Sequence, residues 1–151
     1  MTIGDALRER LLDIGALTAL VSQRVYPLVV RQGEKRASVR FQVIDEDAPQ
    51  HLRGPAGIQT TRVQIDGFVT QSESTTPLTD VEAIADAIHG DGLGTSASGL
   101  FGFTGELGGS PAQYRILNVR RALKRGPMYE HDNEVVRLRV QQDYLIDWKA
   151  L

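Results

Sequence analysis

Few residues of this sequence have the types and spacing that protein chemistry requires. The string Gly92–Ala97 (GLGTSA) matches the GxGxxA pattern of dinucleotide sites, but such a site needs a preceding strand and a helix that opens on the glycines. Here a helix is expected before the string and an irregular segment after it. A second cluster, Asp45, Glu46 and Asp47 with His51, lacks the spacing of a calcium loop or a zinc site. We interpret it as the solvated end of a strand, because runs of charge normally face water.

The histidines do not indicate a catalytic centre. His51 and His131 lie in expected turns, and His89 lies at an expected helix end, where a cation would be favourable. The sequence has neither a Gly-x-Ser-x-Gly elbow nor a phosphate-binding loop. It contains no cysteine, which excludes disulfides, zinc–thiolate sites and thiol nucleophiles. We therefore expect no enzyme activity, no cofactor and no bound metal.

Length and composition indicate one ordinary globular domain. The chain has 151 residues, of which 41% are hydrophobic and 24% charged, which is enough for one domain and too little for two. We treat residues 1–151 as a single domain. The net charge is −2, so the chain has no overall attraction to nucleic acid or anionic membranes. Because it has no long apolar stretch and no signal-peptide pattern at its start, we expect no membrane segment.

A strand and a helix within Thr60–His89 are the best-marked elements. Apolar residues alternate with polar ones over Arg62–Val69, which predicts a strand with a buried face. For the helix, Thr76 is the expected N-cap, Pro77 the first residue and Gly90 the C-terminal stop. Its apolar stripe comprises Leu78, Val81, Ile84, Ala85 and Ile88.

The remaining pattern adds helices at the start and strands at the end. Thr2 can cap a first helix with the stripe Ile3, Leu7, Leu11 and Ile14. Ser38–Glu46 alternates and forms a predicted hairpin with Arg62–Val69 through the turn at Arg53–Gly57. Two further strands are expected at Tyr114–Lys124, with Leu117, Val119 and Leu123 on one face, and at Glu134–Trp148, with a bulge near Gln141 and Gln142. The predicted class is therefore α+β: an antiparallel or mixed β-sheet with long hairpins, packed against two or three helices.

Two regions are candidates for contacts with partners. The glycine-rich loop at 90–113 has apolar residues without periodicity, and long loops of this kind are either functional or disordered. We interpret it as an assembly contact that a partner orders, with Leu100, Phe101 and Phe103 as anchors; the alternative is a mobile surface insertion. Charged residues on the last strands form a candidate interface face, although a solvated sheet surface would look the same: Arg120, Arg121, Arg137 and Arg139.

Three blocks of the sequence together resemble one protein family. ALRERLLDIGALTALVSQRVYP (Ala6–Pro27), HLRGPAGIQTTRVQIDGFV (His51–Val69) and YEHDNEVVRLRVQQDYLIDW (Tyr129–Trp148) resemble, in this order, blocks of the tail-completion or tail-terminator-like proteins of long-tailed phages, prophages and gene transfer agents. The sequence departs from that family at Gly67-Phe68, where a bulkier aromatic is common, and in its longer glycine-rich loop.

This resemblance implies a structural protein of the virion. It implies a small α+β subunit, made in the cytoplasm of the bacterial host, that forms a ring, expected to be a hexamer, in the neck region of the tail. Its implied partners are further copies of itself, the tail-tube protein and the head–tail connector, with double-stranded DNA only as passing cargo and no membrane. The ring would stop tube growth and join tail to head. Two alternatives remain: a head–tail stopper or tube-like subunit of the same particle, or an enzyme with a site under the glycine-rich loop.

Overall fold

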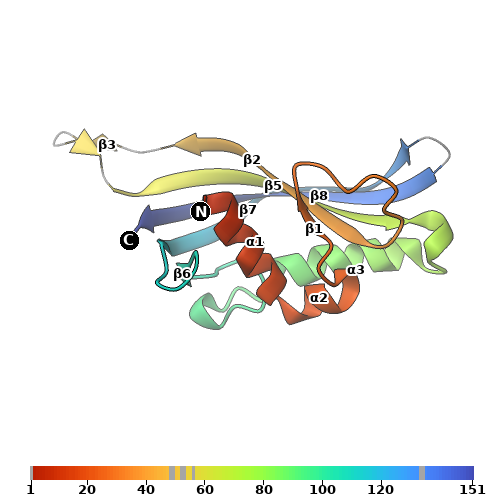
Figure 1. Cartoon of the computed structure of the whole chain (residues 1–151), viewed down its shortest axis with the longest axis horizontal. Coiled ribbons are helices and arrows are strands. Elements are labelled where there is room, and N and C mark those ends of the chain that lie inside the picture. Colours follow the sequence, from red (N-terminus) through yellow and green to blue (C-terminus); the bar gives the residue numbers. More distant parts are fainter. Residues whose placement is uncertain (1, 48–49, 52–53, 56, 133–134) are drawn as a thin grey trace.

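A curved sheet with a layer of helices on one side forms the protein, as Figure 1 shows. The computed structural model describes residues 2–47, 50–51, 54–55, 57–132 and 135–151. The helices are α1 (Ile3–Asp13), α2 (Gly15–Val21) and α3 (Pro77–His89), with 3-10 turns η1 (Gln71–Glu73) and η2 (Gly94–Ser96). The six strands of the main sheet run in the order β1-β2-β5-β8-β7-β6. This arrangement confirms the α+β class.

The strands of the sheet are very unequal in length. The long ones are β2 (Ser38–Asp47), β5 (Gln59–Thr70), β7 (Tyr114–Asp132) and β8 (Val135–Ala150), and the short ones at the two edges are β1 (Val25–Pro27) and β6 (Gly105–Leu107). β1 pairs parallel to β2, and the other neighbours in the sheet are antiparallel. A separate small pair joins β3 (Gln50–His51) to β4 (Gly54–Pro55) in the β2–β5 connection. The predicted hairpin is confirmed, although its turn residues 52, 53 and 56 lie outside the described residues.

Helix α1 forms as its cap and stripe predict. The Thr2 hydroxyl accepts a hydrogen bond from the Asp5 amide at 3.2 Å, and the Asp5 carboxylate accepts from the Thr2 amide at 2.7 Å. This reciprocal capping box satisfies two amide groups that a helix start would otherwise leave without partners. The predicted stripe Ile3, Leu7, Leu11 and Ile14 is buried against the sheet.

Helix α3 matches its prediction in position but not in every detail. Pro77 begins the helix, and Gly90 follows it with a φ of +77°. Thr76 precedes the helix without a capping hydrogen bond to an amide; its hydroxyl contacts the Asp80 carboxylate at 3.2 Å. Leu78 is 58% exposed, so its place in the buried stripe is wrong. Leu78 lies in the first turn of the helix.

Gly67 explains how closely α3 approaches the sheet. It lies on the helix-covered face of β5, opposite Val140 of β8. A Cβ atom at this position would lie only 2.7 Å from Cγ2 of Ile84 and 3.3 Å from Val140 Cγ1. Ile84 therefore occupies the space that a side chain at position 67 would need. The departure from the family pattern at this position is matched by close packing in this chain.

The expected bulge in the last strand is wrong, because the irregularities lie in its neighbour. β8 keeps an unbroken register with β5 from Gln59↔Trp148 to Thr70↔Arg137. The register between β7 and β8 shifts instead between Ile116 and Asn118, between Arg121 and Leu123, and between Arg125 and Met128. Each shift adds a residue to β7 and changes which side chains face the helices. The buried residues are consequently Ile116 and Val119, not the predicted set with Leu117 and Leu123.

Candidate functional site

The helix-free side of the sheet carries a network of charged residues, which we call the polar face. At its centre Asp66 is fully buried. Its carboxylate lies 2.6 Å from Arg40 Nη2 and 3.5 Å from Arg139 Nε, and it accepts a hydrogen bond from Gln64 Nε2 at 3.0 Å. A buried carboxylate requires such partners, because an unpaired charge away from water is very costly.

The network continues along both neighbouring strands. Arg62 Nη2 lies 2.7 Å from Asp143 Oδ2, and Arg120 Nη1 lies 3.1 Å from Asp147 Oδ2. Asp147 also accepts a hydrogen bond from the Thr60 hydroxyl at 2.6 Å. These ion pairs link β2, β5, β8 and β7 across the polar face, and the paired residues do not converge on a shared binding position.

The four predicted interface arginines do not share one face. Strand pairing places Arg120 opposite Leu145 and Arg121 opposite Tyr144, so that these two point to opposite sides of the sheet. Arg120, Arg137 and Arg139 belong to the polar face, whereas Arg121 lies on the helix side and donates to Gln142 Oε1 at 3.1 Å. The prediction of a common face is therefore wrong for Arg121. Arg137 donates to the backbone oxygen of Glu34 at 3.1 Å and so holds the β1–β2 connection over the sheet.

A second network of hydrogen-bonded polar side chains lies between the sheet and α3. His89 Nδ1 is 2.9 Å from the Tyr144 hydroxyl, which donates to Gln142 Oε1 at 3.0 Å. Burial and then the nearby Arg121 lower the pKa of His89, which favours the neutral imidazole. The expected cation at this helix end stays a prediction, and the direction of this shift opposes it. Burial also raises the pKa of Tyr144 above its ordinary value. Tyr144 is buried and His89 is half-buried, so these hydrogen bonds join the end of α3 to β8.

The glycine-rich segment has a packed structure of its own. Arg10 of α1 donates through Nη2 to the backbone oxygens of Ala97 at 2.7 Å and Gly99 at 2.8 Å, and its guanidinium lies 4.1 Å from the centre of the Phe103 ring. Leu100 and Phe103 are buried in the core. The structure thus places two of the three predicted anchors inside the subunit and not on an assembly surface; the ordering of the segment by a partner stays a prediction. Of the two aromatic residues, Phe103 fills space between α1 and β7.

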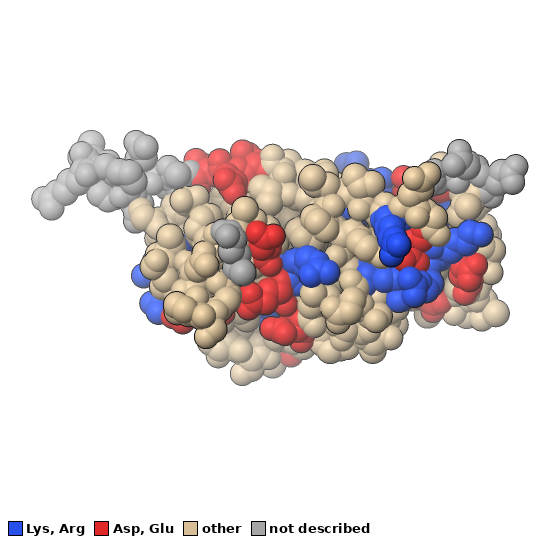
Figure 2. Space-filling model, in the orientation of Figure 1, with Lys and Arg blue, Asp and Glu red and all other residues tan. Residues whose placement is uncertain are grey.

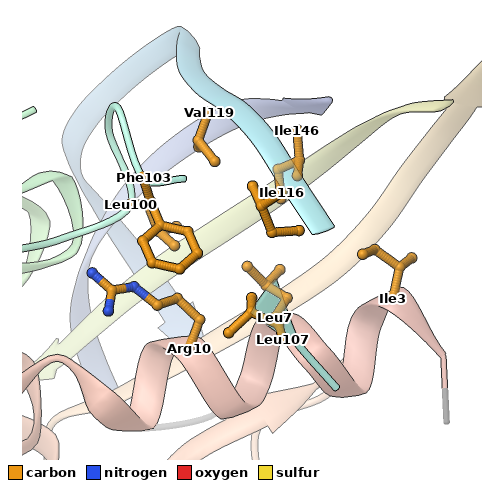
Figure 3. A pocket seen from close by; sticks show the side chains of 9 residues that line it. All are labelled: Ile3, Leu7, Arg10, Leu100, Phe103, Leu107, Ile116, Val119 and Ile146. Carbon is orange, nitrogen blue, oxygen red and sulfur yellow. The ribbon is translucent and has the colours of Figure 1, made fainter. Parts of the chain in front are cut away.

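Phe101 alone of the three predicted anchors has a substantial exposed surface. It is 39% exposed and stacks on His89 with ring centroids 4.7 Å apart. Leu100 and Phe103 instead line an apolar cavity under the segment, which Figure 3 shows between α1 and the strands. The cavity measures about 10 Å³, and Arg10 is its polar lining residue. Convergent polar groups of the kind that an enzyme pocket needs do not line it.

The other candidate sites of the sequence have no ligand geometry in the described residues. The Gly92–Ala97 string follows α3 and contains the turn η2, which differs from the strand–loop–helix arrangement of a dinucleotide site. Within the described ranges no group of three or more His, Asp or Glu residues could hold a metal ion. The side chain of His51 lies outside the described residues. None of the described helices has the length and apolarity to cross a membrane.

Two strand edges remain as the strongest candidate site. β1 pairs only with Val39–Phe41 of β2, so Gln42–Asp47 has an open edge in the described part of the chain. On the opposite side, β6 pairs only with Tyr114–Ile116 of β7, and the Gly102 amide donates to the Val119 oxygen at 2.8 Å. Among the described residues, β7 therefore has an open edge over Arg120–Arg125. Open edges present unpaired N–H and C=O groups, which are a template for another strand.

The two open edges carry opposite charges. We call Gln42–Asp47 the acidic edge and Arg120–Arg125 the basic edge. Asp45, Glu46 and Asp47 are exposed and form no ion pair with any other described residue. Figure 2 shows a cluster of acidic residues near the end of β2. The basic edge contains Arg120, Arg121, Lys124 and Arg125, all exposed. Within the chain Arg120 Nη1 already lies 3.1 Å from Asp147 Oδ2, and Lys124 Nζ lies 2.8 Å from Glu82 Oε2, so a partner's carboxylates would share these cations with acids of the same subunit. The sequence did reveal both charge runs, but not that they lie on opposite borders of one sheet.

Comparisons with known proteins add a fold neighbour and no family. No protein-family model matches the chain, and no curated protein matches it. One solved structure without a functional description in its name has 13% sequence identity to it, with a TM-score of 0.49 over 95% of this chain and 92% of that chain. A likeness at this level carries no argument about function.

Proposed function

We propose that this protein is a ring-forming structural subunit that caps the head-proximal end of a phage-type tail tube and joins the tail to the head connector. The observation that carries the proposal is the pair of open edges on opposite borders of one sheet. A subunit with two different complementary borders associates head to tail, and such contacts close into a ring when the rotation between copies allows it. The resemblance of the three sequence blocks to tail-terminator-like proteins supplies the biological setting.

The polar face suits a channel through which DNA passes. Arg40, Arg62, Arg120 and Arg139 each lie beside an aspartate of the same chain. Arginines held in this way offer few contacts to phosphate groups, and each phosphate contact strengthens binding. A lumen with this surface would let DNA move without retaining it.

The decisive experiment combines the purified protein with polymerising tail-tube subunits and images the products by electron microscopy. The proposal expects tubes with a ring at one end and no further growth from that end. Tube subunits alone are the control, and their tubes should keep growing from both ends. Continued elongation with no bound ring would contradict the proposal. It would favour a head–tail stopper, for which binding to the isolated connector is the test, or a tube-like subunit, which would be incorporated along the tube.

A further inference from the structure

The strand directions determine how one copy can join the next. β2, β5, β8 and β7 are successive antiparallel neighbours, so β2 and β7 run in opposite directions within one subunit. When two copies are related by a rotation about an axis parallel to the strands, each strand runs in the same direction in both copies. The β2 edge of one copy therefore meets the β7 edge of the next as an antiparallel pair.

The two open edges have the same length, and neighbouring parts of the fold mark where each edge begins and ends. β1 covers β2 up to Phe41, and β2 ends at Asp47. The Gly102 contact covers β7 at Val119, and Pro127 beyond Arg125 has no N–H to donate. An antiparallel match that uses both edges in full places Gln42 opposite Arg125 and Asp47 opposite Arg120.

The sides of the sheet agree with this register. Asp47 pairs with Thr60 within the chain, and Arg120 pairs with Leu145, so both side chains belong to the polar face. Glu46 pairs with Thr61, and Arg121 with Tyr144, so both lie on the helix side. A register shifted by one residue would place each acid on the wrong side of its arginine.

We infer that the acidic edge of one copy pairs antiparallel with the basic edge of the next, with Asp47 opposite Arg120 and Glu46 opposite Arg121. The partner is thus a second copy of this chain. The inference rests on the proposed ring and specifies the contact that would close it. Cross-strand pairs of opposite charge are favourable, and the new hydrogen bonds satisfy groups that both edges leave open.

Cysteine trapping tests the register directly, because the chain has no cysteine of its own. One preparation carries Asp47→Cys, and a second, with a mass tag, carries Arg120→Cys. Directly opposed residues of an antiparallel pair have Cβ atoms about 4.5–5.5 Å apart, which is near the separation that a disulfide needs. After mild oxidation of the mixture we expect heterodimers in clear excess over both homodimers. A chain with both substitutions should give a ladder of covalent multimers.

The matched control uses an Asp86→Cys chain, with its cysteine on the exposed surface of α3, in place of the Asp47→Cys chain. It should form heterodimers with the Arg120→Cys chain only at the random proportion. Equal trapping of Arg120→Cys by the two partners, or a random mixture with Asp47→Cys, would overturn the inference.

Charge exchange provides a second measurement that does not depend on a new thiol. Glu46→Arg and Arg121→Glu should each weaken self-association, about two- to fivefold for a single cross-strand pair, as measured by sedimentation. An equimolar mixture of the two variants should recover association, because each copy then offers an edge that complements the other. Asp13→Arg on α1 makes the same charge change as Glu46→Arg away from the edges and should leave association unchanged. Weakening without recovery in the mixture would contradict the pairing.

These measurements need no tail tube, so their outcome separates the contact from the proposed function. Trapped multimers with uncapped tubes would uphold the edge pairing and contradict the role in tail termination. Capped tubes without trapped multimers would uphold that role and overturn the edge pairing.

Discussion

Replacing Trp148 by alanine tests whether the end of β8 is part of the core. The side chain is 6% exposed, its Nε1–H donates to the Thr61 hydroxyl at 2.9 Å, and its ring meets Tyr114 edge-on with centroids 5.1 Å apart. Truncation removes roughly 150–200 Å² of buried surface, which at about 25 cal/mol per Å² corresponds to about 4–5 kcal/mol. Measured losses for large aromatics, about 3–5 kcal/mol, agree with this value.

Urea denaturation followed by far-UV circular dichroism measures the loss. Fluorescence is unsuitable because Trp148 is the only tryptophan. With an m value of about 2 kcal/mol per molar urea, the midpoint should fall by about 2 M. Trp148→Phe keeps a ring but leaves Thr61 without its donor, and should cost about 1–2 kcal/mol. The neighbouring Ile146→Val should cost about 1 kcal/mol. An unchanged midpoint for Trp148→Ala would show that this strand end does not pack in the core, and would refute the reasoning.

Three further changes probe particular contacts. Gly67→Ala should lower the unfolding midpoint, because its Cβ would lie 2.7 Å from Ile84 Cγ2; the loss should be smaller when Gly67→Ala is introduced into an Ile84→Ala background, which lacks that Cγ2 atom, and no loss in the wild-type background would mean that α3 shifts freely. Asp66→Ala should cost about 3 kcal/mol, since it leaves Arg40 and Arg139 without their shared carboxylate; a change within error of wild type in chemical denaturation would disprove a structural role. Hydrogen bonds from Arg36 lower the pKa of Glu34 to about 2, so its stabilising contribution is complete above the ordinary value of about 4.5 and is lost as the pH falls toward 2. Glu34→Gln should therefore flatten the acid limb of the stability profile, and an identical limb in variant and wild type would contradict this assignment.

Periodic patterns along the sequence were sufficient to predict the main elements. The stripes of α1 and α3 and the alternation in β5 and β8 survive in the structure, with Leu78 as the clear exception. Such patterns succeed because the spacing of side chains on one face is a local property of helix or strand geometry. The hairpin from β2 to β5 was predictable for the same reason, since its two patterns lie on either side of turn residues.

Features that depend on neighbouring strands could not be read from the sequence. Three register shifts in β7 decide that Ile116 and Val119 are buried, and nothing local to β7 distinguishes them from Leu117 or Leu123. Asp66 looks like a solvated strand residue until β2 and β8 bring Arg40 and Arg139 beside it.

The glycine-rich segment and the strand edges also combine features that are visible in the sequence with features that only the fold determines. Leu100 and Phe103 have no periodicity, because they are buried by residues distant in the sequence, among them Arg10 of α1, which lies over the Phe103 ring. The charges of Asp45–Asp47 and Arg120–Arg125 are visible in the sequence. Only the strand order makes them opposite borders of one sheet, since strand pairing joins residues far apart in the chain. The sequence by itself thus determined the elements and most of their apolar faces, and the tertiary structure decided which charges pair within the subunit and which strand edges remain open to a partner.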